Sequence, residues 1–364
     1  MKGAFMKGAF MKRHFATDGK AVLRLPSGLQ IGIGNLKAGL ALIALALALA
    51  AISTSLGNTE TGLIQLLRGL AGGHLSDDQA YALWTVRLPR ILLGFMAGWS
   101  VALAGAMLQS VARNPLADPG LFGLSQGSMT TIMLLLVLVP AAPKTLVALA
   151  AVGGGLAVAF LLIALVGRER SSGLAILLMG IAIESALSSV SSVLLLYTPA
   201  ETSLSLADWM AGSLFQASWP TIFVFAPLFG ASLLGIFLIG RALAVFDLGN
   251  EMAMALGETV KRSRPLVIVF AVILSAASVT AVGPLTFLGV IAPHLATFVS
   301  PAVGRARLFL SGLTGGILVV TADTLSRGLV ADTPMPIGLA LTLIGVPLFI
   351  LTLRLQALRR NNSH

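Results

Sequence analysis

Residues 87–127 read RLPRILLGFMAGWSVALAGAMLQSVARNPLADPGLFGLSQG, and the long apolar run inside this stretch decides the fold. The run at 91–111 contains no charged side chain, and basic residues border it, Arg90 before and Arg113 after. About 20 residues of helix cross the ~30 Å hydrocarbon core of a bilayer. Because the run is continuous and not alternating, it predicts a transmembrane helix and not a strand of a membrane barrel.

Similar apolar runs continue on both sides of this stretch. The chain has 364 residues, of which 57% are hydrophobic and only 10% are charged, whereas a soluble domain carries about 25% charged residues. We therefore expect an all-α polytopic membrane protein with about ten crossings. The predicted helices are 38–56, 91–111, 121–139, 145–166, 174–197, 219–240, 265–283, 285–299, 308–330 and 337–353.

The distribution of basic residues orients this topology. With ten crossings and a cytoplasmic N-terminus, 19 of the 24 Lys and Arg residues fall on the cytoplasmic side, as the positive-inside rule predicts. Both termini are then cytoplasmic. The predicted parts are a basic N-terminal tail at 1–37, a transmembrane domain at 38–353 and a C-terminal tail at 354–364. The five basic residues left outside are Arg68, Arg87, Arg90, Lys144 and Arg327.

Several function classes are excluded by what the sequence lacks. There is no cysteine, and the four histidines are scattered, so we expect no metal site and no cofactor. No Gly-x-x-x-x-Gly-Lys-Ser/Thr run is present, so any ATP hydrolysis belongs to another chain and we expect no enzyme here. The net charge of +10 is explained by orientation, so no nucleic acid partner is expected. The repeat of Met1–Phe5 as Met6–Phe10 leaves the start codon open.

Ordered motifs make the chain resemble the FecCD family of ABC importer permeases. They are Arg87-Leu88-Pro89-Arg90, Gln109, Asn114-Pro115-Leu116-Ala117-Asp118-Pro119-Gly120, Trp209, Gly212-Ser213, Ala255-Leu256-Gly257, Gly283-Pro284, Phe287-Leu288-Gly289, Pro293-His294, Ala322-Asp323, Pro336-Ile337-Gly338 and Gly345-Val346-Pro347. The chain departs from the family pattern at two positions. It has Ser128 where the family often has alanine, and Pro334 where the family usually has an acidic residue.

This resemblance implies that the domain at 38–353 is a permease domain in the inner membrane of a bacterium. The family moves ferric siderophores, haem and cobalamin, and siderophore transport is its commonest role, so the cargo we expect is a ferric siderophore, with haem or cobalamin as the alternative. The implied partners are ABC ATPase subunits below the membrane and a periplasmic or lipoprotein substrate-binding protein above it. A second permease, either an identical copy or a paralogue, is expected to complete the pore within the lipid bilayer.

The external arginines have two readings. Side chains of this type commonly extend along helix ends to reach water. A guanidinium also pairs with a carboxylate through two hydrogen bonds, and in the family the arginines at these positions face glutamates of the binding protein. The resemblance therefore makes Arg87, Arg90 and Arg327 candidate docking residues.

The largest predicted cytoplasmic loop, 241–264, carries apolar residues at helical spacing. On its own, this pattern fits a short amphipathic helix lying on the membrane. In the family the loop couples the permease to the ATPase, which makes Ala255, Leu256, Gly257 and Glu258 candidate coupling residues. Gly257 should divide the segment into two short pieces.

The predicted fifth helix carries the most polar sequence within the bilayer. Ser188, Ser191 and Ser192 follow Glu184 at i+4, i+7 and i+8, which places them toward one helical face. A mid-membrane carboxylate is costly and should face protein or water. These four residues are either internal hydrogen-bonding groups or the wall of a translocation pathway between two permeases.

Two other function classes remain as alternatives. An ion-coupled secondary transporter would have inverted repeats, broken helices and paired intramembrane charges, but only Glu184 and Asp323 are available as intramembrane charges. An integral-membrane enzyme would have clustered acids or histidines, and Asp77-Asp78 is the only such pair, in an external loop.

Overall fold

A computed structural model describes residues 12–15, 21–24, 30–56, 59–166, 173–198, 206–329 and 335–361. Arg168, Arg170 and Pro334, used above for orientation and for the family pattern, lie outside these residues.

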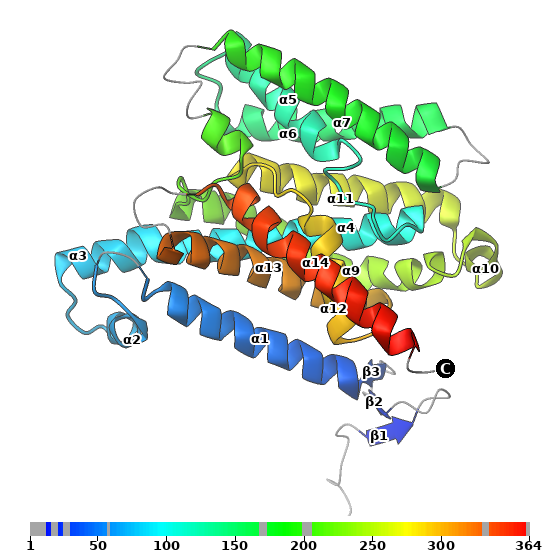
Figure 1. Ribbon diagram of the computed structural model, residues 1–364, viewed down its shortest axis with the longest axis horizontal. Coiled ribbons are helices and arrows are strands. Elements are labelled where there is room, and N and C mark those ends of the chain that lie inside the picture. The colour runs from blue at the N-terminus through cyan, green and yellow to red at the C-terminus, as the bar shows by residue number, and fades with distance from the viewer. Residues whose placement is uncertain are drawn as a thin grey trace, which may run out of the picture.

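The described part of the chain is a bundle of helices whose long axes run broadly side by side (Figure 1). Every predicted apolar segment contains a helix. The bounds are α1 Ile33–Ser53, α4 Leu88–Ala112, α5 Leu124–Leu138, α6 Lys144–Val166, α7 Gly173–Leu196, α9 Trp219–Phe246, α11 Val260–Val282, α12 Leu288–Val299, α13 Gly304–Leu329 and α14 Ile337–Asn361.

Among the described residues, eight helices are long and apolar enough to cross a membrane, and α5 and α12 are shorter apolar helices. Both short helices begin later than predicted, and in each the residue before the helix has a positive φ: 71° at Gly123 and 60° at Phe287. The chain thus reaches both helices through non-helical backbone, at 113–123 and 283–287.

Short elements lie at both ends of the bundle. At one end are α2 Leu63–Leu70, α3 Asp77–Ala80 and the π-helical stretch η1 Tyr81–Arg87, which continues into α4. At the other end lie α10 Asn250–Ala255, the C-terminal end of α14 and the first strands (Figure 1). The described N-terminal and C-terminal segments therefore lie at the same end of the bundle (Figure 1).

The predicted tails contain regular structure that the sequence analysis did not anticipate. Strands β1 Lys12–Phe15, β2 Ala21–Arg24 and β3 Gln30–Gly32 form an antiparallel sheet in the order β1-β2-β3. Helix α1 begins at Ile33, and α14 continues to Asn361, past the predicted limit at 353.

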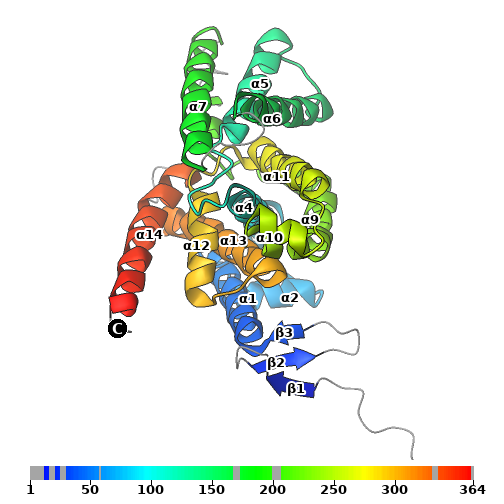
Figure 2. The same ribbon diagram turned by 90° about the vertical axis from the view of Figure 1, so that its right-hand side faces the viewer.

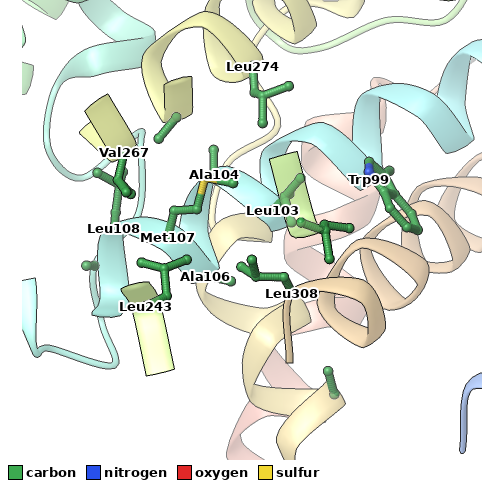
Figure 3. Packing of buried hydrophobic residues seen from close by; sticks show 14 of the residues in the cluster. Trp99, Leu103, Ala104, Ala106, Met107, Leu108, Leu243, Val267, Leu274 and Leu308 are labelled. Carbon is green, nitrogen blue, oxygen red and sulfur yellow. The ribbon is translucent and has the colours of Figure 1, made fainter. Parts of the chain in front are cut away.

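The core of the bundle forms where α4 meets α13, α9 and α11. Trp99 on α4 is only 2% exposed, and its ring makes edge-to-face contacts with Phe229 and Phe309 at centroid distances of 5.6 and 5.5 Å. Its indole N–H donates to Ser232 Oγ on α9 at 2.9 Å. Leu103, Met107 and Leu108 continue the same buried cluster along α4 (Figure 3). The indole bond satisfies the one polar atom that a buried tryptophan carries.

Glycines on α4 allow close contacts with neighbouring helices. A Cβ atom at Gly98 would overlap the carbonyl oxygen of Gly315 on α13. A Cβ atom at Gly105 would overlap the backbone of Gly289 on α12. Small residues let membrane helices approach until their backbones touch, so α4 packs closely against both partners.

Candidate functional sites at the two ends of the bundle

A cluster of charged residues joins the outer ends of α4 and α13. Arg90 Nε donates to Asp323 Oδ1 at 2.7 Å, and Arg327 Nε donates to Asp323 Oδ2 at 3.0 Å. Asp323 is buried, with 2% of its side chain exposed, while Arg90 and Arg327 keep 14% and 18% exposed. One carboxylate thus holds two arginines, and this part of the cluster keeps a net positive charge at the surface.

The two arginines differ in what they still offer to a partner. The terminal nitrogens of Arg327 donate to the carbonyl oxygen of Leu56 and to Ser53 Oγ, both from the end of α1. Arg90 uses only Nε in the bonds that the structure shows. Since a guanidinium has five N–H donors, the outer edge of Arg90 remains available.

Arg87, the third predicted docking residue, is buried instead, at 5% exposed. Its guanidinium donates to the carbonyl oxygens of Thr54 and Thr59 and to the hydroxyl of Thr61. These three threonines belong to the segment that follows α1, so Arg87 fastens that segment to the start of α4. In this conformation it does not present a charge to a partner.

The predicted coupling segment lies at the opposite end of the bundle. Gly257 has φ +83° and separates two helices, α10 ending at Ala255 and α11 beginning at Val260. Only α10 is the short piece that was predicted, because α11 continues to Val282. Ala255, Leu256 and Gly257 are exposed, and Glu258 is half-buried. Large apolar side chains around them are also exposed, namely Leu248 at 61%, Met252 at 52%, Met254 at 57% and Leu256 at 56%.

The segment that carries this apolar surface is bonded to the rest of the bundle. Ala253 is fully buried, so α10 is anchored through its opposite face. Arg307 Nη1 at the start of α13 pairs with Asp247 Oδ2 at 3.3 Å, and its Nη2 donates to Gln109 Oε1 on α4 at 2.9 Å. Gln109 in turn donates to the carbonyl oxygen of Gly289. The segment is therefore connected to α4, α12 and α13.

The four polar residues predicted on one face of the fifth helix, α7, do not share one environment. Ser191 is fully buried and bonds to Gln126 and Thr130 on α5 at 3.0 and 2.8 Å. Glu184 and Ser188 are half-buried, and Ser192 is exposed. Ser185 and Ser189, which the sequence analysis did not select, are exposed on the same helix. Their spacing with Ser192 could have indicated the second polar face.

Comparison with known proteins identifies this arrangement. The profile of the FecCD transport family matches residues 43–355. The chain belongs to the FecCD transport family. An iron(3+)-hydroxamate import system permease of Bacillus subtilis (strain 168) is 30% identical over 306 residues, covering 82% of this chain and 91% of that protein. A hemin transport system permease of Yersinia pestis is 33% identical over 301 residues, covering 81% and 90%.

A solved structure shares the fold. A metal-chelate type ABC transporter in an inward-facing conformation matches with a TM-score of 0.74 at 26% identity, covering 88% of this chain and 99% of that chain. The FecCD chain is therefore a multi-pass inner-membrane permease of an ABC importer. It is the membrane component and not the catalytic subunit, and it works with a separate ATPase and a substrate-binding protein.

One residue of this FecCD chain that sequence reasoning did not select is Asp118, between α4 and α5. The carboxylate is 2% exposed, and Oδ1 accepts the backbone N–H of Gly120 at 2.7 Å. Oδ2 has no partner at hydrogen-bonding geometry but faces the first turn of α12, at Gly289 and Val290. Burial raises the pKa of Asp118 to about 6, although these backbone N–H groups act to lower it. The sequence feature that could have indicated Asp118 is its position between two prolines.

Asp118 should make stability depend on pH. Because its folded pKa of about 6 lies above the ordinary value of 3.8, the folded state binds the proton more tightly. Its contribution is then complete at low pH and is lost as pH rises toward 6, by about 3 kcal/mol in all and about 1 kcal/mol above pH 5. We expect Asp118→Asn to reduce the fall in thermal midpoint between pH 5 and pH 7, measured in detergent. Asp78→Asn, at an exposed site, should leave that fall unchanged; equal behaviour of the two variants would contradict this assignment.

Proposed function

We propose that this FecCD chain forms the translocation pathway for a ferric siderophore, with haem or cobalamin as the alternative cargo. The observation that carries the proposal is the pair of surfaces at opposite ends of one bundle, a cationic cluster outside and an exposed apolar segment inside. An importer permease needs both, one for the binding protein and one for the ATPase. A secondary transporter needs neither, which leaves it a distant alternative.

The cargo proposal rests on the family and its relatives. A ferric hydroxamate permease and a hemin permease are similarly related to this chain, so the cargo has to be separated by experiment. Proteoliposomes containing the permease, its ATPase and its binding protein should take up ⁵⁵Fe-hydroxamate in an ATP-dependent way. Excess unlabelled ferric siderophore should compete, whereas hemin and cobalamin should not. Uptake of hemin alone would transfer the proposal to the alternative cargo.

For the pathway itself, we propose that α7 and α14 face a second permease. Both lie on one side of the molecule (Figure 2), and the 18-residue core of α7 is only 11% buried. Leu339 and Leu343 on α14 are exposed as well. Glu184, Ser188 and Ser192, with Ser185 and Ser189 beside them, would then form part of the wet wall, while Ser191 ties α7 to α5. Co-purification would show whether the second permease is an identical copy or a paralogue.

For docking, we propose that Arg90 and Arg327 receive carboxylates of the binding protein, with Arg87 holding the loop beneath them. Arg90→Gln removes the one guanidinium edge that stays available, so the Kd for the binding protein should rise about tenfold. Arg68→Gln removes an external charge on α2, outside the cluster, and should leave the Kd unchanged. Microscale thermophoresis on the purified permease complex measures both; an unchanged Kd for Arg90→Gln would refute docking at this cluster.

For coupling, we propose that Ala255, Leu256 and Gly257, which are exposed, contact the ATPase, while the half-buried Glu258 beside them lines the groove between α9 and α11. A Cβ atom at Gly257 would meet nothing within 4 Å, so a large side chain there points outward. The φ of +83° strains any residue other than glycine, so the effect of size is read against a small residue that tolerates this conformation. Gly257→Trp should therefore block seating of the ATPase and reduce transport per ATP hydrolysed about tenfold or more. Gly257→Asn should retain much more transport, since asparagine tolerates a positive φ. Normal coupling in Gly257→Trp would contradict the proposal.

A further inference from the structure

A groove runs along the surface between α9 and α11, with a volume of about 720 Å³. Its walls are almost entirely apolar. Arg241, Glu258 and Ser263 also line it, and all three lie at the same end, where α9 leaves the bundle and α11 enters it.

Gly235 and Phe270 line this groove from its two sides. Gly235 on α9 is buried, and a Cβ atom there would press on the ring of Phe270 from α11. Leucines form the rim and remain open, with Leu234 66%, Leu238 80% and Leu266 67% exposed. The groove is thus a cleft between two helices with an apolar floor and an apolar edge.

The groove matches one leaflet of the bilayer. Its lining on α9 runs from Ala231 to Ala242, which is about 16 Å of helix and close to half of the ~30 Å hydrocarbon core. The polar end coincides with the cytoplasmic surface that the positive-inside rule assigns. Helices α9 and α11 lie on the side of the molecule opposite α7 and α14 (Figure 2). The groove therefore opens toward lipid and away from the proposed second permease.

The charges at the polar end are complementary to a particular headgroup. Arg241 is exposed and Glu258 half-buried, and within the described part of the chain no ion pair joins them or uses either one. Ser263 donates its hydroxyl to the carbonyl oxygen of Thr259 at 3.1 Å, which leaves its oxygen free to accept. A cation, an anion and an acceptor are thus held apart at the mouth of one apolar groove.

We infer that this groove binds a phospholipid whose headgroup carries both a phosphate and a primary ammonium, as in phosphatidylethanolamine. Arg241 pairs with the phosphate, Glu258 and Ser263 accept N–H groups from the ammonium, and an acyl chain fills the cleft. Phosphatidylglycerol has no cation for Glu258, and the methylated ammonium of phosphatidylcholine has no N–H to donate. The inference depends on the chain spanning the membrane and not on its cargo.

The test compares three lipids with identical dioleoyl chains, with ethanolamine, choline and glycerol headgroups. The full-length permease in detergent is titrated with each lipid, and bound lipid is counted by native mass spectrometry. The ethanolamine lipid should bind about tenfold more tightly than the other two, the worth of a charge-assisted hydrogen bond. Equal binding of the three lipids would overturn the inference.

Charge variants separate the two halves of the headgroup. Glu258→Gln should abolish the preference for ethanolamine over choline, and Arg241→Gln should weaken all three lipids about tenfold. Glu251→Gln and Arg354→Gln change the same charges at exposed positions outside the groove and should have no effect. A preference that survives in Glu258→Gln, or binding unchanged in Arg241→Gln, would refute the headgroup assignment.

Filling the groove tests the acyl-chain site. Ala231→Phe places a ring at the end opposite the charges and should reduce binding of every lipid. Excess phosphoethanolamine without chains should not displace the bound lipid; displacement would assign the site to a soluble phosphate and refute the groove. Gel filtration verifies that each variant is folded. If Ala231→Phe fails to fold, the result for Glu258→Gln, which breaks no ion pair among the described residues, still decides the test.

Discussion

Asp323→Ala is expected to lower the free energy of unfolding by about 3–5 kcal/mol, because it strips the buried counterion from two arginines at once. Arg90 and Arg327 both donate to this carboxylate, and both have less than a fifth of their side chains exposed. Without Asp323, two like charges would face each other in a poorly hydrated place. The loss should appear as a much lower thermal midpoint of the detergent-purified protein and as reduced yield.

The structure provides a matched control for this prediction. Asp247 also pairs with an arginine, Arg307, but at 3.3 Å and with 28% of the aspartate exposed. A pair of this surface type contributes about 0–1 kcal/mol, so Asp247→Ala should shift the midpoint only slightly. If both variants lost the same stability, burial would not be what makes the Asp323 cluster important.

Gly105→Leu should be strongly disruptive in the core of the bundle. A Cβ atom at this position would overlap the Cα, carbonyl carbon and oxygen of Gly289, which are backbone atoms that no rotamer change can move. Overpacking alone costs about 1–3 kcal/mol where side chains can yield, so a backbone overlap should cost about 3 kcal/mol or more. The bond from Gln109 to Gly289 and the position of Asp118 beside α12 would be lost with it.

Gly153→Leu is the control for this second prediction. Gly153 is also inside a helix, α6, but a Cβ atom there would meet nothing within 4 Å. Replacing a helical glycine with a good helix former gains about 0.5–1 kcal/mol where space allows. The thermal midpoint should therefore stay or rise for Gly153→Leu and fall sharply for Gly105→Leu. Similar midpoints for the two variants would show that α4 and α12 do not pack as described.

Much of the fold was predictable because lipid imposes a simple rule on the sequence. Backbone groups in a bilayer must bond within their own helix, so each apolar run that was long enough became a helix. The starts of α5 and α12 were not predictable in this way. Phe287 adopts a positive φ because α12 must begin where it can pack against Gly105 and Gln109 of α4. No local sequence pattern predicts that contact.

The candidate sites were predictable in part, for a similar reason. The sequence indicated which basic residues stand at the outer end, but a charge pattern does not reveal burial. Arg87 is enclosed because Thr54, Thr59 and Thr61 accept its hydrogen bonds, and Asp323 lies 233 positions from Arg90. Ser191 faces inward because Gln126 and Thr130 of α5 supply its partners. Each of these facts is a tertiary contact between distant parts of the chain.

The packing of α1 has a consequence for the order of events at the ribosome. Among helices, α1 makes its most extensive contacts with α13, and about 250 residues separate Ser53 from Gly304. At 5–20 residues per second, α1 must wait in the membrane for about 10–50 s before its main partner is synthesised. Its mean hydropathy of 2.2 over the apolar core lets it remain inserted alone during that time. Nascent chains that stall before α13 would thus carry an unpaired first helix, open to membrane chaperones and proteases.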